Sequence, residues 1–186
     1  IVEHGANPGL VSHLTKKALF DIATSAIKDG KVSGIEQALA DENFPILATD
    51  VSGKALATAR EGRFPGHLVD RGLSSEHRHR FFRAEGNSWT VCEELRRLIE
   101  FRRLNLIDRL NIVGQFEVIF CRNVLIYFDA TVRQRVCEQF YELLTPGGLL
   151  IIGAAESLYR LETPFVTEQL GATTVYRKPA ARLSGP

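Results

Sequence analysis

The sequence predicts an α/β fold in which helices cover both faces of a mostly parallel sheet. The stretch 116–128 opens with an apolar run, Val118–Phe120, that is short enough for a buried parallel strand and turns polar directly afterwards. Strand-like runs also alternate with helical segments along most of the chain, as in parallel sheets with helical crossovers. The residues after Val118–Phe120 therefore stand at the carboxyl edge of the sheet, where open α/β folds bind ligands.

Length and composition predict a globular protein of one domain or one and a half domains. The chain has 186 residues, 45% of them hydrophobic, and its net charge of +1 gives no sign of nucleic-acid binding. No apolar run approaches the roughly 20 residues of a membrane span, so we expect no direct membrane insertion. Cys92, Cys121 and Cys137 are odd in number and lack metal-ligand spacing, which predicts reduced thiols, a cytoplasmic location and no metal site. The chain contains no methionine, which predicts that it is a piece of a longer protein.

The first third of the chain predicts helices before and after one strand. Apolar residues recur at helical spacing after Ser12, and Ser33–Glu36 is a capping box. Ser52 is a helix cap and Gly62 a helix stop. The predicted elements are a strand end at 1–2, a turn at 3–9, helices at 12–29 and 33–42, a strand at 46–49 that ends at Asp50, and a helix at 52–62.

The rest of the chain contains an insertion and then resumes the alternation. Residues 63–100 break the rhythm and predict a small β-rich insertion. Gly171 marks the turn of a closing hairpin. The predicted elements are a polar helix at 74–83, a β-like run at 88–92, a segment at 93–98, strands at 99–102 and 118–120, a helix at 130–144, a turn at 145–148, a strand at 149–152, a hairpin at 166–178 and a tail from 179.

Polar residues directly after the central strand are the first candidates for a site. Arg122 offers a charged fork, and Asn123 offers both a donor and an acceptor, so either residue can bind a carboxylate or an amide. The alternative is a surface loop paired with Asp129. Tyr127 can orient a substrate carboxyl at the mouth of this site, or it can pack in the core between its apolar neighbours.

Two further candidates also follow predicted strands. Asp50 can accept hydrogen bonds from ribose hydroxyls, as acidic residues do in dinucleotide folds, or it can serve only the start of the next helix. Asn105 can read an adenine edge while Leu106 packs on the ring; the alternative is an ordinary turn asparagine. The basic run His77–Arg80 is expected to be a solvated helix face.

Five segments, taken in order, resemble the catalytic domain of CheR-type chemotaxis receptor methyltransferases. The resemblance covers roughly 46–178, and its most specific piece is FCRNVLIYF. The other segments are ILATDVSGKALATAREGRF, LIEFRRLNLID, LLTPGGLLIIGAAESL and TTVYRK. The resemblance implies a Rossmann-like class I methyltransferase sheet with a small β-rich insertion and a terminal β-hairpin.

The resemblance also implies a reaction, a cofactor and a partner. The family transfers a methyl group from S-adenosylmethionine to glutamate side chains in the cytoplasmic domain of chemotaxis receptors. By position, Tyr127 is implied to lie near the transferred methyl. The residues implied to bind the donor are Asp50 at the ribose, Asn105 and Leu106 at the adenine, and Arg122 and Asn123 along the site.

The beginning of the chain departs from the family. A Gly-x-Ser-Thr-Gly-Glu-Glu-Pro-Tyr-Ser type loop that holds the donor, and a basic helical domain before it, are not found. Instead, residues 1–43 resemble a segment of bacterial homospermidine synthases, which are NAD-dependent enzymes. The chain is thus predicted to be a fusion: an atypical segment 1–45, a methyltransferase domain 46–178 with its insertion 63–100, and a tail 179–186.

Three functions follow from these observations. The first is a protein-glutamate methyltransferase domain, for which Glu3–Gly9 would replace the missing donor loop. The second is a non-catalytic methyltransferase-like binding module, favoured by the loss of that loop. The third is a fragment of an NAD-dependent polyamine enzyme, which the chain supports least because it lacks a GxGxxG fingerprint.

Overall fold

The computed structural model describes residues 2–4, 46–67, 69, 75–110, 113–170 and 173–180. These residues belong to two compact units, one formed by Ile1–His4 with Leu104–Pro186 and the other by Gly5–Arg103. The predicted helices 12–29 and 33–42, most of the turn 3–9 and the hairpin turn at Gly171 lie outside the described residues. Within the described residues, no helix is long and apolar enough to cross a membrane.

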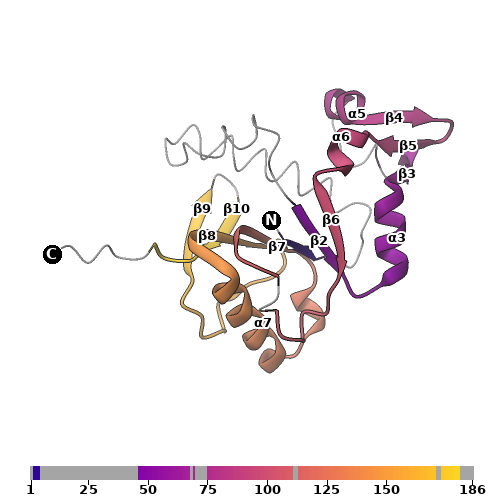
Figure 1. The fold of residues 1–186 in the computed structure, drawn as a ribbon. Coiled ribbons are helices and arrows are strands. Elements are labelled where there is room, and N and C mark those ends of the chain that lie inside the picture. Colours follow the sequence, from indigo (N-terminus) through magenta and orange to yellow (C-terminus); the bar gives the residue numbers. More distant parts are fainter. Residues whose placement is uncertain are drawn as a thin grey trace. The chain divides into compact units, whose positions relative to one another are not determined.

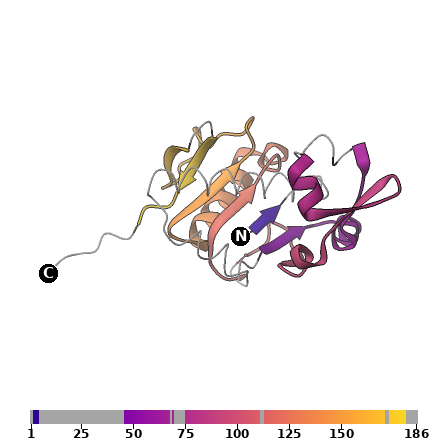
Figure 2. The ribbon, with the colours of Figure 1, turned by 90° about the horizontal axis from the view of Figure 1, so that it is seen from above.

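The first unit contains a sheet whose central strands are parallel, as predicted (Figure 1). Strand β7 pairs in parallel with β1 on one side and β8 on the other, and the antiparallel β10 and β9 extend the sheet beyond β8 (Figure 2). The last paired residues of β7 and β8 are Cys121 and Ile152. The strands are β1 (Val2–His4), β7 (Phe116–Cys121), β8 (Leu144–Ile152), β9 (Val166–Leu170) and β10 (Thr173–Arg177).

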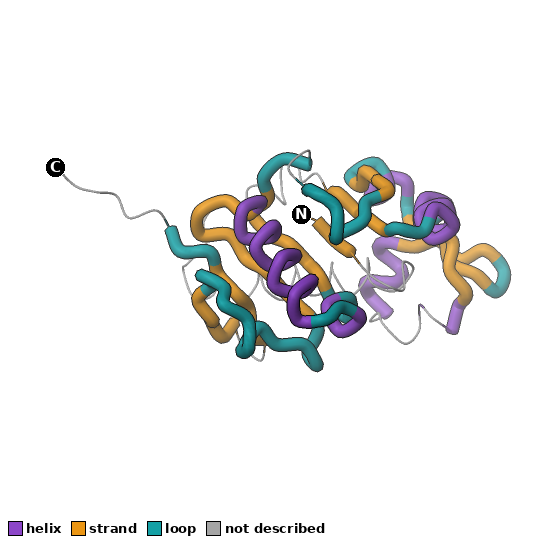
Figure 3. Tube along the Cα trace, turned by 90° about the horizontal axis from the view of Figure 1, so that it is seen from below, coloured by secondary structure: helices purple, strands orange, loops and turns teal. Residues whose placement is uncertain are grey.

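Helix α7 (Ala130–Leu143) packs along this sheet (Figure 3). The carboxylate of Asp129 accepts a hydrogen bond from the Val132 N–H at 2.9 Å and caps the helix, as the sequence predicts. One face of α7 is buried, and it carries Val136, Cys137, Phe140 and Leu143. This spacing is that of one side of an α-helix, so the burial of this face fixes α7 on the sheet.

The predicted turn at 145–148 is wrong, because these residues form the first half of β8. Gly147 adopts a left-handed backbone, with φ of 85°, which lets the strand bend without ending. The Gly147 N–H donates to the Lys178 carbonyl at 3.0 Å, and the Lys178 N–H donates to the Gly148 carbonyl at 2.9 Å. Pairing with the residue that follows β10 therefore replaces the expected chain reversal.

The second unit combines a parallel strand pair with a small antiparallel sheet, which matches the predicted β-rich insertion. Strand β2 (Ile46–Asp50) pairs with β6 (Ile99–Arg103), and helix α3 (Gly53–Glu61) packs beside them. The small sheet has the order β3-β5-β4, and its strand β4 was not predicted. Its elements are β3 (Arg63–Pro65), α5 (Ser75–Phe81), β4 (Phe82–Glu85), β5 (Ser88–Val91) and α6 (Glu93–Arg96).

Lys178 stabilises the point where α7 passes into β8. Its ammonium group donates to the carbonyls of Tyr141 at 2.8 Å and Leu144 at 2.7 Å, and it lies 4.7 Å from the centre of the Tyr141 ring. The last carbonyls of a helix lack partners within the helix and carry its negative dipole end. The last turn of α7 has no basic residue of its own, so Lys178 supplies the missing cation from the end of β10.

We therefore expect Lys178→Met to lower the free energy of unfolding by about 1.5–3 kcal/mol, the range for hydrogen bonds to a charged group. Urea denaturation followed by circular dichroism measures this change. Lys54→Met is the matched control, because Lys54 is exposed on α3 and its loss should change stability by less than about 0.5 kcal/mol. Equal losses for the two variants would contradict this role of Lys178.

Candidate functional site

The predicted site begins where β7 leaves the sheet. Ile119, Phe120 and Cys121 have no solvent exposure, so the strand is fixed up to its last residue. Arg122 and Asn123 follow at the carboxyl edge, as predicted. Asn123 has a φ of 59°, a left-handed conformation that asparagine tolerates better than most residues. This conformation turns the chain sharply away from the strand direction.

A short 3-10 helix, η1 (Leu125–Tyr127), continues from this turn and presents Tyr127 to solvent. Leu125 is buried and anchors the turn, whereas Tyr127 is 70% exposed and Ile126 is 52% exposed. Of the two interpretations of Tyr127, core packing is therefore wrong. The phenol stands at the edge of the sheet, where it is free to meet a ligand.

Glu156 joins the ends of β7 and β8 through backbone hydrogen bonds. Its Oε2 accepts from the Gly153 N–H at 2.6 Å and from the Asn123 N–H at 2.8 Å. Its Oε1 accepts from the Ile126 N–H at 3.2 Å. A Cβ atom at Gly153 would lie 2.5 Å from Asn123 Oδ1 and 2.7 Å from Glu156 Oε2. The arrangement therefore requires glycine at position 153.

Arg122 has hydrogen-bonding capacity that the described part of the chain leaves unused. The residue is partly buried, and its buried Nε has no hydrogen-bond partner among the described residues. A buried guanidinium nitrogen without a partner costs free energy unless a ligand or water completes it. The surface pairing with Asp129 is not seen, since Asp129 caps α7 instead.

In the second unit, Asp50 ends β2 as a buried carboxylate. It is 8% exposed, and its Oδ1 accepts a hydrogen bond from the Ser52 N–H at 2.7 Å. Ser52 in turn caps α3 through the Ala55 N–H at 3.2 Å. The helix-start role of Asp50 is thus present, and the predicted ribose contact stays a prediction.

Asn105 and Leu106 form a turn that is tied to α7. Asn105 Oδ1 accepts from the Ile107 N–H at 3.2 Å, which is the geometry of a turn asparagine. Leu106 is only 1% exposed, and its carbonyl accepts from Gln139 Nε2 at 3.2 Å. The side chain of Leu106 therefore supports the turn from within the core, and the predicted adenine contacts of both residues stay predictions.

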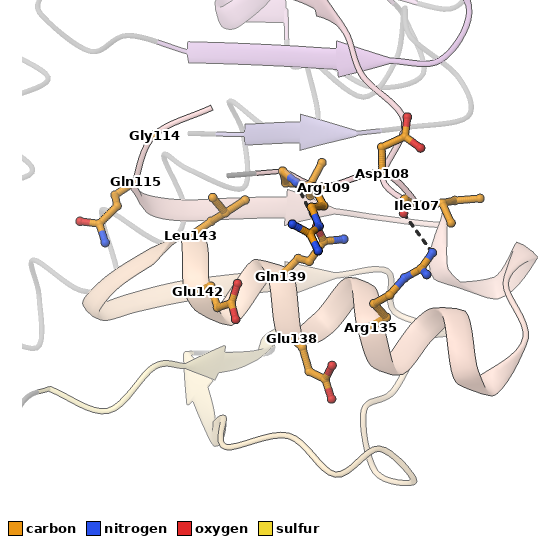
Figure 4. A pocket seen from close by; sticks show the side chains of 11 residues that line it. Ile107, Asp108, Arg109, Gly114, Gln115, Arg135, Glu138, Gln139, Glu142 and Leu143 are labelled. Atoms are coloured by element: carbon orange, nitrogen blue, oxygen red, sulfur yellow. Dashed lines mark hydrogen bonds between the residues drawn. The ribbon is translucent and has the colours of Figure 1, made fainter. Parts of the chain in front are cut away.

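A cavity of about 720 Å³ lies between α7 and the residues that precede β7 (Figure 4). Arg135 crosses it to donate to the Ile107 carbonyl at 3.0 Å. No predicted site residue lines this cavity, so it is separate from the carboxyl edge of β7. Its lining residues are Ile107, Asp108, Arg109, Leu110, Gly114, Gln115, Arg135, Glu138, Gln139, Glu142 and Leu143.

The two buried thiols of this unit are held in their neutral form. Burial raises the pKa of Cys121 well above its usual value, and the negative charge of Glu156 adds to the effect. Burial likewise raises the pKa of Cys137 to about 12, although Arg133 lowers it in part. Because the thiolate is the reactive form, these cysteines are poor nucleophiles. The described residues also contain no group of three His, Cys, Asp or Glu side chains placed to hold a metal ion.

Residues 32–174 match the protein family described as CheR methyltransferase, SAM binding domain. The chain belongs to this CheR methyltransferase family. Over 133 residues it is 41% identical to Chemotaxis protein methyltransferase 1 of Pseudomonas aeruginosa, 39% to a Chemotaxis protein methyltransferase of Vibrio parahaemolyticus and 38% to Chemotaxis protein methyltransferase Cher2 of Pseudomonas putida. Each alignment covers 71% of this chain and 48% of the relative, so the chain spans about half the length of these proteins.

The family match confirms the CheR resemblance and the class I methyltransferase fold that it implied. The match begins at residue 32, inside the segment 1–43 for which a resemblance to homospermidine synthase was predicted. These comparisons give no support to that second resemblance. The replacement of the donor loop by Glu3–Gly9 cannot be followed beyond His4, since residues 5–9 lie outside the described part of the chain.

The residues of the CheR-family chain fit the donor that the family domain binds. The unpartnered Nε of Arg122 offers a hydrogen bond at the carboxyl edge. Gly153 lets Asn123 and Glu156 approach the backbone closely, because a Cβ atom there would collide with both residues. Asp50 is a carboxylate at the end of its own strand, and an acidic residue is the type that binds ribose hydroxyls in dinucleotide folds.

Glu156 and Gly153 are the features of this site that sequence reasoning missed. Neither residue was predicted to have a role in a site. The sequence does contain a signal for this contact. Glu156 follows Gly153 by three residues, directly after β8, the strand that pairs with β7. That spacing allows the carboxylate to fold back onto the glycine N–H, as the hydrogen bond at 2.6 Å shows.

We expect a thiol reagent at pH 8 to label Cys92 alone in the native protein, because Cys92 is partly exposed and the other two thiols are buried and protonated. All three should react in denaturant. Counting labelled thiols by mass spectrometry tests this labelling pattern; native labelling of Cys137 at pH 8 would contradict it.

The neutral Cys137 thiol also makes stability depend on pH. Its contribution to the free energy of unfolding is complete below about pH 9 and is lost as the pH rises toward about 12, because the thiol of the unfolded chain ionises first.

Proposed function

We propose that this chain is the donor-binding part of an S-adenosylmethionine-dependent protein-glutamate methyltransferase that acts on chemotaxis receptors. The observation that carries the proposal is the carboxyl edge of β7, where Arg122, Asn123 and Tyr127 follow a strand whose last three residues have no solvent exposure. The family match and the names of the relatives support the same activity. The partner of the reaction is then the cytoplasmic domain of a chemotaxis receptor.

The proposed roles follow from the chemistry of the reaction. When bound, S-adenosylmethionine supplies a methyl group that is attached to a positively charged sulfonium. A carboxylate can accept this methyl group directly. The protein therefore contributes mainly position, and correct orientation alone lowers such barriers by several kcal/mol. Asp50, Asn105, Leu106, Arg122 and Asn123 are proposed to hold the donor.

The receptor glutamate is proposed to approach across Tyr127. Ile126 and Tyr127 expose 52% and 70% of their surfaces on a turn that Leu125 and Glu156 hold in place. Because the backbone of this turn is held, two adjacent large side chains can contact a protein substrate without ordering of the turn itself. The phenol O–H of Tyr127 can then donate to the carboxylate and orient it.

A binding module without catalytic activity is the second candidate function. The sequence feature that favours it is the glycine-rich donor loop expected for the family, which is not found in residues 1–186. Such a module would bind a receptor without methylating it. A fragment of an NAD-dependent polyamine enzyme is the remote alternative. Binding of NAD to the chain would be needed to support it.

Domain limits and location are part of the proposal. We take residues 46–178 as the methyltransferase domain, 63–100 as its insertion, and 1–45 and 179–186 as flanking segments. A reaction on the cytoplasmic domain of a receptor implies a cytoplasmic location.

Calorimetric titration of the chain with S-adenosylhomocysteine tests donor binding. We expect saturable binding, weakened by about 1.5–3 kcal/mol, or roughly 10- to 160-fold, in Asp50→Ala, because a charge-assisted contact is lost. Asp50→Asn keeps an acceptor for the Ser52 N–H but removes the charge, and it should also bind more weakly. Glu93→Gln is the control, since Glu93 only pairs with Arg97 at an exposed site. Parent-like binding by both Asp50 variants would remove Asp50 from the site.

Transfer of labelled methyl groups to a receptor cytoplasmic fragment tests catalysis. We expect Tyr127→Phe to lower the transfer rate about tenfold, the effect of losing one hydrogen bond of roughly 1.4 kcal/mol in the transition state. Tyr159→Phe is the matched control, because Tyr159 is a second exposed tyrosine, 92% accessible, in the loop after β8. Donor binding without any transfer by the parent chain would favour the binding module.

A further inference from the structure

Glu156 occupies the place where two parallel strands separate. The pairing of β7 with β8 ends at Cys121 and Ile152, and the next residues of each strand have no ladder partner in the other. Backbone N–H groups at such a point need another acceptor, and each hydrogen bond that a side chain supplies contributes about 0.5–1.5 kcal/mol. The bond at Gly153 is partly buried, whereas the bond at Asn123 is exposed. Oε2 of Glu156 accepts from one N–H on each side of the opening, at Asn123 and Gly153.

The same carboxylate reaches one step further along the chain. Its Oε1 accepts from the Ile126 N–H inside η1. All three donors are backbone groups, so the contacts depend on the path of the chain and not on the side chains of Asn123 or Ile126. One side chain thus fixes the start and the middle of the segment that carries Arg122, Asn123 and Tyr127.

The chemistry of the donors favours a carboxylate over an amide. An ionised glutamate has acceptors only, whereas glutamine must present an NH₂ group at one of its two positions. With its oxygen at the Oε2 position, glutamine would keep the two shorter contacts, at 2.6 and 2.8 Å. Its NH₂ group would then face the Ile126 N–H, and that contact would be lost.

We propose that Glu156 is a positioning residue for methyl transfer. It holds the left-handed turn at Asn123 for donor binding through Oε2, and it holds η1, with Tyr127, for the receptor glutamate through Oε1. This inference rests on the proposed function and adds to it a residue that contacts neither donor nor substrate. It also assigns a separate role to each carboxylate oxygen: Oε2 acts in donor binding and Oε1 in placing Tyr127.

Glu156→Gln and Glu156→Ala in the full chain test the proposal. In Glu156→Gln, we expect S-adenosylhomocysteine affinity within about threefold of the parent and a methyl-transfer kcat lowered about tenfold, since only the Ile126 contact is lost. In Glu156→Ala, both donor affinity and kcat should fall at least about tenfold. Glu162→Ala is the control, because it removes the same charge from an exposed position in the same loop.

Amide hydrogen exchange distinguishes positioning from general destabilisation. We expect faster exchange at Ile126 alone in Glu156→Gln, and at Asn123, Ile126 and Gly153 together in Glu156→Ala, while β7 stays protected. Gly153→Ala is the second variant, since its Cβ displaces the same carboxylate and should weaken donor binding with Glu156 present. If Glu156→Ala does not fold, Glu156→Gln and Gly153→Ala decide the matter.

The results for the parent chain and for the Glu156 variants separate the positioning role from the proposed function. A folded parent chain that binds no S-adenosylhomocysteine overturns both. A parent that binds and transfers methyl groups, with Glu156 variants that lose stability but keep the parent affinity and kcat, overturns only the positioning role. Equal loss of affinity and kcat in Glu156→Gln overturns the division between the two oxygens.

Discussion

Ile119, Phe120 and Cys121 are shielded from solvent because β1 and β8 pair with β7 on its two sides and α7 packs on the sheet. A strand held in this way cannot slide by one residue without moving every side chain to the opposite face. The place where β7 ends is therefore fixed to within a residue, and so is the position of Arg122. The site proposed after β7 depends on this burial, because the position of the turn is set by the fixed end of the strand.

Sequence reasoning predicted well where local signals and burial agree. The apolar run before Arg122 marked the end of β7, Asp129 marked the start of α7, and Ser52 and Gly62 bounded α3. These positions are set by contacts within a few residues, namely caps, turns and one buried strand. The end of β7 in turn predicted the location of the candidate site, because open α/β sheets bind ligands at the carboxyl ends of their strands.

What escaped prediction depends on contacts between distant parts of the chain. Gly147 looked like a turn, but Arg177 and Lys178, about 30 positions later, pair with it, and the strand continues through it. The turn at Leu106 is tied to α7 by Gln139, which lies 33 positions away. Glu156 contacts Asn123 from 33 positions away. None of these partners can be read from spacing along the sequence.

Helix α7 ends at Leu143 and β8 begins at Leu144, so no loop residue separates them. One residue inserted at this junction would shift the far end of β8 by about 3.3 Å along β7, the rise of one strand residue. Gly153 and Glu156 would then miss Asn123. Over evolutionary time, insertions and deletions should be excluded from this junction and tolerated better in the loop between Tyr159 and Phe165, which belongs to no strand.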